Sequence, residues 1–262
     1  MNYKGYLKKN KDIVGMIHIR ALPGTPLNSM DVDEIVDIAV NEAKVYKKLG
    51  FKTVMIENMH DVPYTKVIRP EIISAMSVIG REIKEQGLFC GIQILAGGNK
   101  EALGVAKAAN LDFIRAEGFV FGHIGDEGYY DSCAGELLRY RKEIKADNVL
   151  VFTDIKKKHS SHAITSDVSV KETAHAAEFF LSDGVVITGT STGVEPKIED
   201  LELDVKIPVI IGSGITSENI DGFYGKADVF IVGSYFKKDG NWKNELDEKR
   251  IKRFMEKWKK LS

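Results

Sequence analysis

The sequence predicts an α/β fold, a single (β/α)8 barrel of the TIM, phosphate-binding type that occupies residues 1–262 as one domain. Three observations predict it. Eight short apolar segments alternate with longer segments of helical periodicity. The length of 262 residues is close to the roughly 250 residues of such a barrel. Clusters of small residues follow the last two apolar segments, where barrels of this kind bind phosphate.

The apolar segments are short and rich in Val, Ile and Phe, as is typical of parallel strands that helices cover on one face. The expected strands are residues 13–19, 53–58, 89–95, 112–116, 149–154, 184–188, 208–211 and 229–232. Each would be one strand of the barrel.

Helical spacing of apolar residues separates these strands. Gly50 and Gly87 follow the first two periodic segments and act as stop signals. The expected helices are residues 32–49, 71–86, 100–109, 135–144, 170–181 and 248–261, with a shorter one at 217–223 and only a turn or two within 198–203.

An open doubly wound sheet is the alternative architecture. Its phosphate fingerprint, G-x-G-x-x-G, would follow the first strand. Residues 20–26 instead read RALPGTP, which favours the barrel.

Composition narrows the class of protein. The net charge of -1, from 37 basic and 38 acidic residues, argues against a nucleic-acid partner. Two cysteines indicate a reducing compartment rather than a disulfide framework. No apolar run reaches the roughly 20 residues of a transmembrane segment. The first 11 residues are polar and rich in lysine, unlike a signal peptide, so we expect a cytoplasmic protein.

Polar residues stand where the apolar strands end, and the active sites of such barrels are built there. Strand alternation directs these residues to the barrel mouth: His18, Arg20, Glu57, Gln93, Arg115, Glu117, Asp154, Lys156 and Thr188. Asp154 and Lys156 are expected to form an acid/base pair, or Lys156 to form a Schiff base. His18, Glu57 and Glu117 are further catalytic candidates. The alternative is that the charged residues are paired at the rim without chemistry.

The phosphate prediction rests on Gly212, Ser213 and Gly214 after the seventh strand and on Gly233 and Ser234 after the eighth. Small residues let backbone N–H groups approach an anion closely. Tight turns alone would also explain the glycines.

Two loops are unusually long. Residues 117–132 suggest a lid or an interface. Residues 156–167 form a basic surface that is either solvated or attracts an anionic substrate. The six histidines lack zinc spacing, so no zinc site is expected, and no organic cofactor is indicated. Glu57, Glu117 and Asp154 leave Mg²⁺ open as a cofactor. Cys133 lacks an identifiable base and is interpreted as a packing residue.

Several longer motifs carry a family resemblance. They are MIHIRALPG at 16–24, ENMHDVPY at 57–64, GIQIL at 91–95, RAEG at 115–118, TDIKKKH at 153–159, TGT at 188–190 and IGSG at 211–214. The chain resembles the BtpA/SgcQ family over nearly its whole length. The resemblance implies a phosphate-binding barrel. One member of that family is associated with photosystem I biogenesis and another belongs to a sugar-utilisation gene cluster, but nothing in this sequence shows a link to photosynthesis.

Two classes of function follow. The first is an enzyme that acts on a small phosphorylated metabolite, a sugar or nucleoside phosphate, by isomerase, lyase or glycosidic-bond chemistry. The second is a non-catalytic assembly or biogenesis factor, for which an exposed apolar patch outside the mouth would be the mark. A homo-oligomer is compatible with either class.

Overall fold

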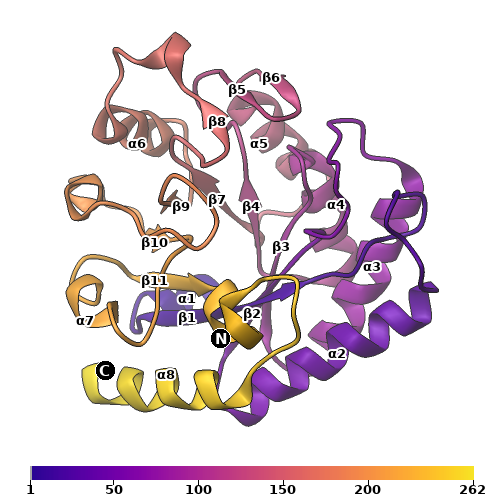
Figure 1. Ribbon diagram of the computed structural model, residues 1–262. Coiled ribbons are helices and arrows are strands. Elements are labelled where there is room, and N and C mark those ends of the chain that lie inside the picture. The colour runs from indigo at the N-terminus through magenta and orange to yellow at the C-terminus, as the bar shows by residue number, and fades with distance from the viewer. Residues whose placement is uncertain (1) are drawn as a thin grey trace.

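The computed structural model describes residues 2–262, and a closed barrel of eight parallel strands forms its centre (Figure 1). Its strands, in their order around the barrel, are β1 (Asp12–His18), β2 (Thr53–Glu57), β3 (Phe89–Gln93), β4 (Phe113–Ala116), β7 (Leu150–Asp154), β9 (Gly184–Ile187), β10 (Val209–Ile211) and β11 (Val229–Val232). β11 pairs with β1, with Asp12 opposite Val229, and this pairing closes the barrel. The TIM barrel predicted from the sequence is confirmed.

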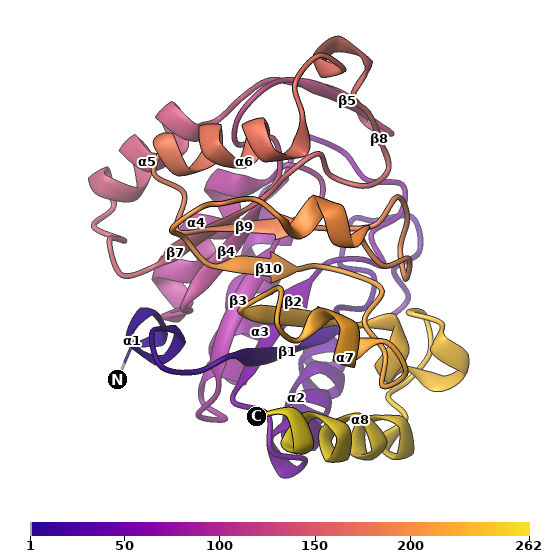
Figure 2. The same ribbon diagram turned by 90° about the vertical axis from the view of Figure 1, so that its left-hand side faces the viewer.

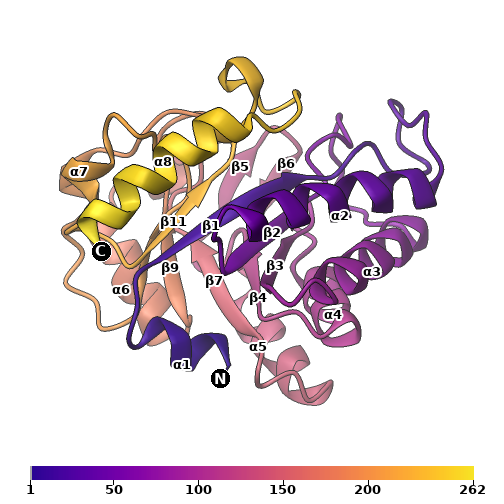
Figure 3. The same ribbon diagram turned by 90° about the horizontal axis from the view of Figure 1, so that it is seen from below.

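Helices surround the barrel, as the apolar periodicity predicted. They are α2 (Val32–Lys48), α3 (Pro70–Lys84), α4 (Asn99–Ala109), α5 (Ala134–Glu143), α6 (Val170–Phe179), α7 (Ile220–Phe223) and α8 (Glu248–Leu261). The weak sixth unit holds only the 3₁₀ turn η2 (Ile198–Leu201). α8 lies beside α2 (Figures 1 and 3), and an exposed ion pair between Lys48 and Glu248 links the two helices.

Strand alternation produces two separate apolar clusters. Outward residues such as Ile17, Val54 and Ile92 pack against the helices. Inward residues fill the barrel: Val14, Met16, Met55, Phe113, Leu150, Phe152, Val186, Ile210, Val229 and Ile231. On several strands, the inward position that follows these apolar residues holds a polar side chain. The apolar filling of the barrel therefore stops just below the mouth.

A short helix that the sequence did not reveal, α1 (Tyr3–Leu7), closes the other end of the barrel (Figure 2). Tyr3 is 2% exposed and stacks on Phe113, with ring centroids 5.1 Å apart. Its hydroxyl donates a hydrogen bond to the buried Asp12. Ligand access to the barrel interior is therefore from the opposite end, where the strands finish.

The long loop after β4 is an ordered hairpin of β5 (His123–Gly125) and β6 (Gly128–Tyr130). β5 also pairs with β8 (Ser160–Ser161), which belongs to the loop after β7. This three-stranded antiparallel sheet, the mouth sheet, lies over one side of the barrel mouth. The mouth sheet joins the loop after β4 to the loop after β7, the two long loops noted in the sequence.

The remaining short elements are three 3₁₀ turns, η1 (Ala163–Thr165), η3 (Ser234–Phe236) and η4 (Lys238–Gly240). None of the helices within residues 2–262 has both the length and the apolar character needed to span a bilayer.

Candidate active site

A cavity of about 390 Å³ opens at the carboxyl ends of the strands, within the size range of small-molecule sites. Most of the residues predicted for the site line it: His18, Glu57, Gln93, Arg115, Glu117, Asp154, Gly212, Ser213, Gly214, Gly233 and Ser234. Four of them, His18, Glu57, Arg115 and Asp154, each follow a residue of the apolar barrel interior by two positions. Alternation thus explains why the sequence located them correctly.

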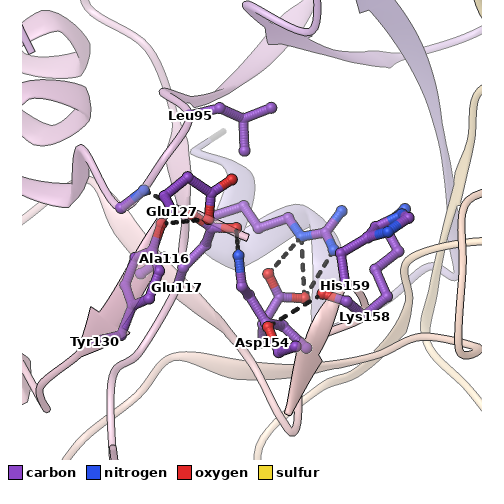
Figure 4. A network of polar contacts seen from close by, with 12 residues as sticks. Leu95, Ala116, Glu117, Glu127, Tyr130, Asp154, Lys158 and His159 are labelled. Carbon is purple, nitrogen blue, oxygen red and sulfur yellow. Dashed lines mark hydrogen bonds and ion pairs between the residues drawn. The ribbon is translucent and has the colours of Figure 1, made fainter. Parts of the chain in front are cut away.

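Arg115 and Asp154, which both line the cavity, form a buried ion pair, and Figure 4 shows the dashed contacts that reach Asp154. The Arg115 Nη2 donates to Asp154 Oδ1 over 2.7 Å, and Nε lies 3.1 and 3.2 Å from the two carboxylate oxygens. Burial lowers the pKa of Arg115, but Asp154 more than compensates, so that the pKa is raised and the guanidinium stays charged. Asp154 is therefore held as the partner of a cation.

A second ion pair links the loops after β4 and β7. Lys157 Nζ donates to Glu117 Oε1 over 2.9 Å, and both side chains are buried. The other oxygen of Glu117 accepts the Gly97 N–H. Lys157 also lies over the Tyr130 ring of the mouth sheet, 4.9 Å from its centroid. Glu117 consequently holds the cavity wall together through several contacts.

Glu57 has a different environment, because no hydrogen bond or ion pair holds its carboxyl group within residues 2–262. Burial is the largest influence on it and raises the pKa of Glu57, although Arg115 and Lys158 oppose the shift. A raised pKa favours the protonated form of a carboxyl group, which is the form that donates a proton. Glu57 is thus better suited to general acid chemistry than the paired Asp154.

Uncharged polar atoms also face the cavity without partners. Burial lowers the pKa of His18 well below its usual value, and the charges of Lys237, His60 and Lys158 lower it further. The ring is therefore neutral at pH 7. In the described part of the chain, His18 Nδ1 and Gln93 Oε1 are buried and accept or donate no hydrogen bond. Buried polar atoms usually have partners, so these two are available to a ligand.

The expected position of Lys156 is wrong. β7 ends at Asp154, so strand alternation no longer applies two residues later. Lys156 has φ +44°, and this left-handed turn directs its side chain away from the mouth, where Nζ donates to the Thr165 carbonyl. Lys157 and Lys158 line the cavity instead. The pairing of Asp154 with Lys156 as acid and base has no geometric support.

Two other predicted residues lie outside the cavity lining. β1 ends at His18, and Arg20 donates to the Lys243 carbonyl at the rim. Thr188 follows the end of β9 and packs near Gly212, while its hydroxyl is buried without a partner among the described residues. Both were expected at the mouth because alternation was extended past the ends of their strands.

The glycine clusters after β10 and β11 form one end of the cavity. The backbone N–H groups of Ser213, Gly214 and Ser234 have no acceptor within residues 2–262. Gly214 also has a structural role: its φ is +76°, and an added Cβ would lie 2.1 Å from the Glu195 nitrogen. Gly233 is less restricted, since a Cβ there would meet the His18 ring at 3.1 Å.

Sequence reasoning missed Arg250 and Trp242, which both line the cavity from beyond β11. Arg250, from α8, donates through Nε to the Tyr235 carbonyl, and its guanidinium lies over the Tyr235 ring. It has no acidic partner in the described chain. Trp242 packs edge-on against His60 and His18. Neither residue follows a strand directly, so strand-end spacing could not identify them.

The carboxylates do not gather as a metal site. Asp154 and Glu117 each have a basic partner, and among residues 2–262 no group of three or more His, Cys, Asp or Glu side chains could hold a metal ion. The Mg²⁺ option through Glu57, Glu117 and Asp154 is not supported by their arrangement. Cys133 is half-buried, and burial raises the pKa of its thiol to about 11, as suits a packing residue.

With the fold and the cavity described, comparison with known proteins gives the family. The family model for the BtpA family matches residues 9–260. The chain belongs to the BtpA family. The resemblance carried by the sequence motifs is thereby confirmed.

BtpA-family relatives occur in distant organisms. The chain is 51% identical over 253 residues to an uncharacterized mitochondrial protein, F13E9.13, of Caenorhabditis elegans, covering 93% of this chain and 91% of the relative. It is 30% identical to the photosystem I biogenesis protein BtpA of Synechocystis, covering 93% and 86%.

Several solved structures share the barrel fold. Tryptophan synthase from M. tuberculosis superposes with a TM-score of 0.59 at 13% identity, covering 98% of both chains. KGPDC from Streptococcus mutans superposes with a TM-score of 0.59 at 9% identity, covering 96% of this chain and 99% of that one. At these identities the likeness concerns the barrel fold alone.

Proposed function

We propose that this BtpA-family chain is an enzyme that binds a small phosphorylated metabolite, a sugar or nucleoside phosphate, in the cavity at the barrel mouth. One observation carries the proposal: Arg250 lines the same cavity as Ser213, Gly214 and Ser234, whose backbone N–H groups have no acceptor within residues 2–262. A guanidinium beside free backbone donors is a favourable environment for a phosphate.

The rest of the cavity suits the remainder of such a molecule. Hydroxyl and carbonyl groups would meet the charged pair of Arg115 and Asp154, the amide of Gln93 and the neutral ring of His18. Glu57 would be the proton donor, because burial raises the pKa of its carboxyl group and no basic side chain is bound to it within residues 2–262. Trp242 would cover the ligand from the solvent side. Proton transfer of this kind serves isomerase and lyase chemistry and glycosidic bond cleavage alike.

Arg250→Met tests the phosphate assignment. Loss of a charge-assisted hydrogen bond removes roughly 1.5–3 kcal/mol, so we expect affinity for inorganic phosphate to fall by about tenfold or more. Thermal-shift titration with inorganic phosphate measures it, with ribose 5-phosphate as a larger ligand. Arg253→Met is the matched control, because Arg253 lies on the same helix but pairs with the exposed Glu218. Equal affinities in the two variants would contradict the site.

A non-catalytic assembly role is the second candidate, and one observation favours it. Phe179, Phe180 and Leu181, at the end of α6, are 82%, 48% and 69% exposed. Large apolar side chains that are exposed together mark contact surfaces. The Synechocystis relative is named a biogenesis protein, which is compatible with such a contact. The two roles are not exclusive, since the apolar residues lie outside the cavity lining.

A further inference from the structure

Three consecutive lysines in the loop after β7 have three different environments, and only one presents a free amine to the cavity. Lys156 Nζ donates to the Thr165 carbonyl over 2.8 Å, away from the mouth. Lys157 Nζ is bound to Glu117 over 2.9 Å. Lys158 lines the cavity, and within residues 2–262 its Nζ has neither a hydrogen-bond acceptor nor an ion-pair partner. The contrast makes Lys158 the residue whose nitrogen is open to a ligand.

The loop that carries Lys158 is held on both sides. Before it, Lys157 is anchored to Glu117; after it, β8 pairs with β5 of the mouth sheet. His162 adds a further link, because its Nε2 lies 2.9 Å from the Lys157 carbonyl. A reactive side chain needs a fixed backbone to reach a ligand in one geometry. The mouth sheet therefore provides the rigidity that a long loop would otherwise lack.

The surroundings of Lys158 disfavour its charged form. Burial lowers the pKa of Lys158, and the neighbouring Arg115 guanidinium lowers it further. Glu57, Asp154 and Glu117 act in the opposite direction but do not reverse the shift. Asp154 and Glu117 are already neutralised by Arg115 and Lys157. Compared with a lysine of ordinary pKa, Lys158 therefore carries its neutral amine a larger fraction of the time, and the neutral amine is the nucleophilic form.

We propose that Lys158 forms a Schiff base with the carbonyl group of a phosphorylated aldehyde or ketone. This inference rests on the proposed function, because the phosphate at Arg250 and Ser234 would hold the carbonyl compound in the cavity. Lys158 thereby takes the role that the sequence assigned to Lys156. The substrate class narrows to a small carbonyl compound that carries a phosphate.

The atoms balance with the groups present. The Nζ lone pair attacks the carbonyl carbon, the π electrons move to the carbonyl oxygen, and one amine proton is transferred to that oxygen. Glu57 then donates its carboxyl proton to the resulting hydroxyl group, which leaves as water while the C=N bond forms. The products are a protonated imine on Lys158, a carboxylate on Glu57 and one water molecule. The carboxylate and the imine cation then stabilise one another.

Pyridoxal 5′-phosphate is a suitable probe, used here as a reagent that joins an aldehyde to a phosphate. The full-length protein is incubated with it at a one-to-one ratio, reduced with borohydride and mapped by peptide mass spectrometry. We expect Lys158 to be labelled at least about tenfold faster than any other lysine, because its lowered pKa favours the neutral amine and the phosphate directs the aldehyde to it. Inorganic phosphate should slow the labelling.

Lys158→Met should remove the fast labelling, whereas the matched variant Lys156→Met should retain it. Circular dichroism and phosphate titration of both variants show whether the fold and the phosphate site persist. Labelling that follows Lys156, or that is distributed over surface lysines without preference for Lys158, would overturn the proposal.

Pyridoxal, which lacks the phosphate, separates this inference from the proposed function. If pyridoxal labels Lys158 as fast as the phosphorylated reagent and phosphate does not compete, the amine assignment stands and the phosphate site fails. If phosphate binds with Arg250 dependence but Lys158 is not labelled preferentially, the phosphate site stands and the Schiff base is refuted.

Discussion

His123 illustrates how a buried histidine ties the stability of the mouth sheet to pH. Its ring stacks on Tyr130 with centroids 4.8 Å apart, and His162 lies 5.4 Å away. Burial lowers the pKa of His123 to about 4, and the positive charges of Lys157 and His162 contribute. Its Nε2 is buried without a partner among residues 2–262. The ring is therefore maintained in its neutral form throughout the physiological range.

Acid should weaken the protein through His123. In the unfolded chain its imidazole takes up a proton near pH 6.5, but in the folded chain only near pH 4, so the unfolded state binds more protons between these values. The free energy of unfolding should then fall as pH falls from 6.5 to 4, by about 1–3 kcal/mol on account of this residue. Urea unfolding of the protein and of His123→Gln at pH 7 and pH 4.5 measures the difference.

The exposed His175→Gln variant is the control for that comparison. We expect it to lose as much stability on acidification as the unmodified protein, whereas His123→Gln should lose less. An identical loss in all three proteins would show that His123 does not contribute to the acid sensitivity.

Among the elements, α1 contributes more to the packing at the closed end of the barrel than its five residues suggest. Tyr3 inserts under the barrel, where it contacts Phe89, Phe113 and Phe152. Its hydroxyl and that of Thr53 both donate to Asp12, so a carboxylate buried at the barrel floor is satisfied by two hydrogen bonds. The first 11 residues as a whole are rich in lysine, and the five residues of α1 are too few to show helical periodicity, so the sequence did not reveal the role of Tyr3.

Tyr3→Ala should destabilise the protein by about 3–5 kcal/mol, because it leaves a cavity among aromatic rings and removes a donor from Asp12. Tyr3→Phe keeps the ring and loses only the hydrogen bond, so we expect a smaller loss of about 1–2 kcal/mol. Chemical denaturation of the two variants measures both values. If alanine and phenylalanine cost the same, packing beneath the barrel is not the source of the stabilisation.

For the whole molecule, the two ends of the barrel are suited to different contacts. Strands and helices run in opposite directions, so the end of α6, with its exposed Phe179 and Leu181, lies away from the mouth. A surface at this end can bind another chain without covering the cavity. Association and chemistry can therefore be separated by substitution.

Phe179→Ser combined with Leu181→Ser tests that separation. If the apolar side chains are a contact surface, the protein should sediment as an oligomer and the double variant at a lower mass, with phosphate affinity unchanged. Analytical ultracentrifugation and phosphate titration provide the two readouts. An unchanged sedimenting mass would argue against a self-association surface at α6.

The sequence alone determined the barrel and the inward strand-end residues, because both follow from short-range rules. In a regular strand, side chains alternate between the barrel interior and the helix layer. Met16 and His18 therefore face the same way, as do Phe152 and Asp154. The same rule failed at Arg20 and Lys156, which lie beyond the ends of their strands. There the backbone turns, as the φ of +44° at Lys156 shows, and alternation no longer applies.

Only the tertiary structure decided which charges are paired and which remain free. Asp154 is separated from Arg115 by 39 residues, and Glu117 is separated from Lys157 by 40, so their pairing depends on how strands and loops from different units meet at the mouth. Arg250 reaches the cavity from the last helix, and Lys158 is placed by the mouth sheet. Such contacts arise from barrel closure and long-range packing, to which local periodicity carries no signal.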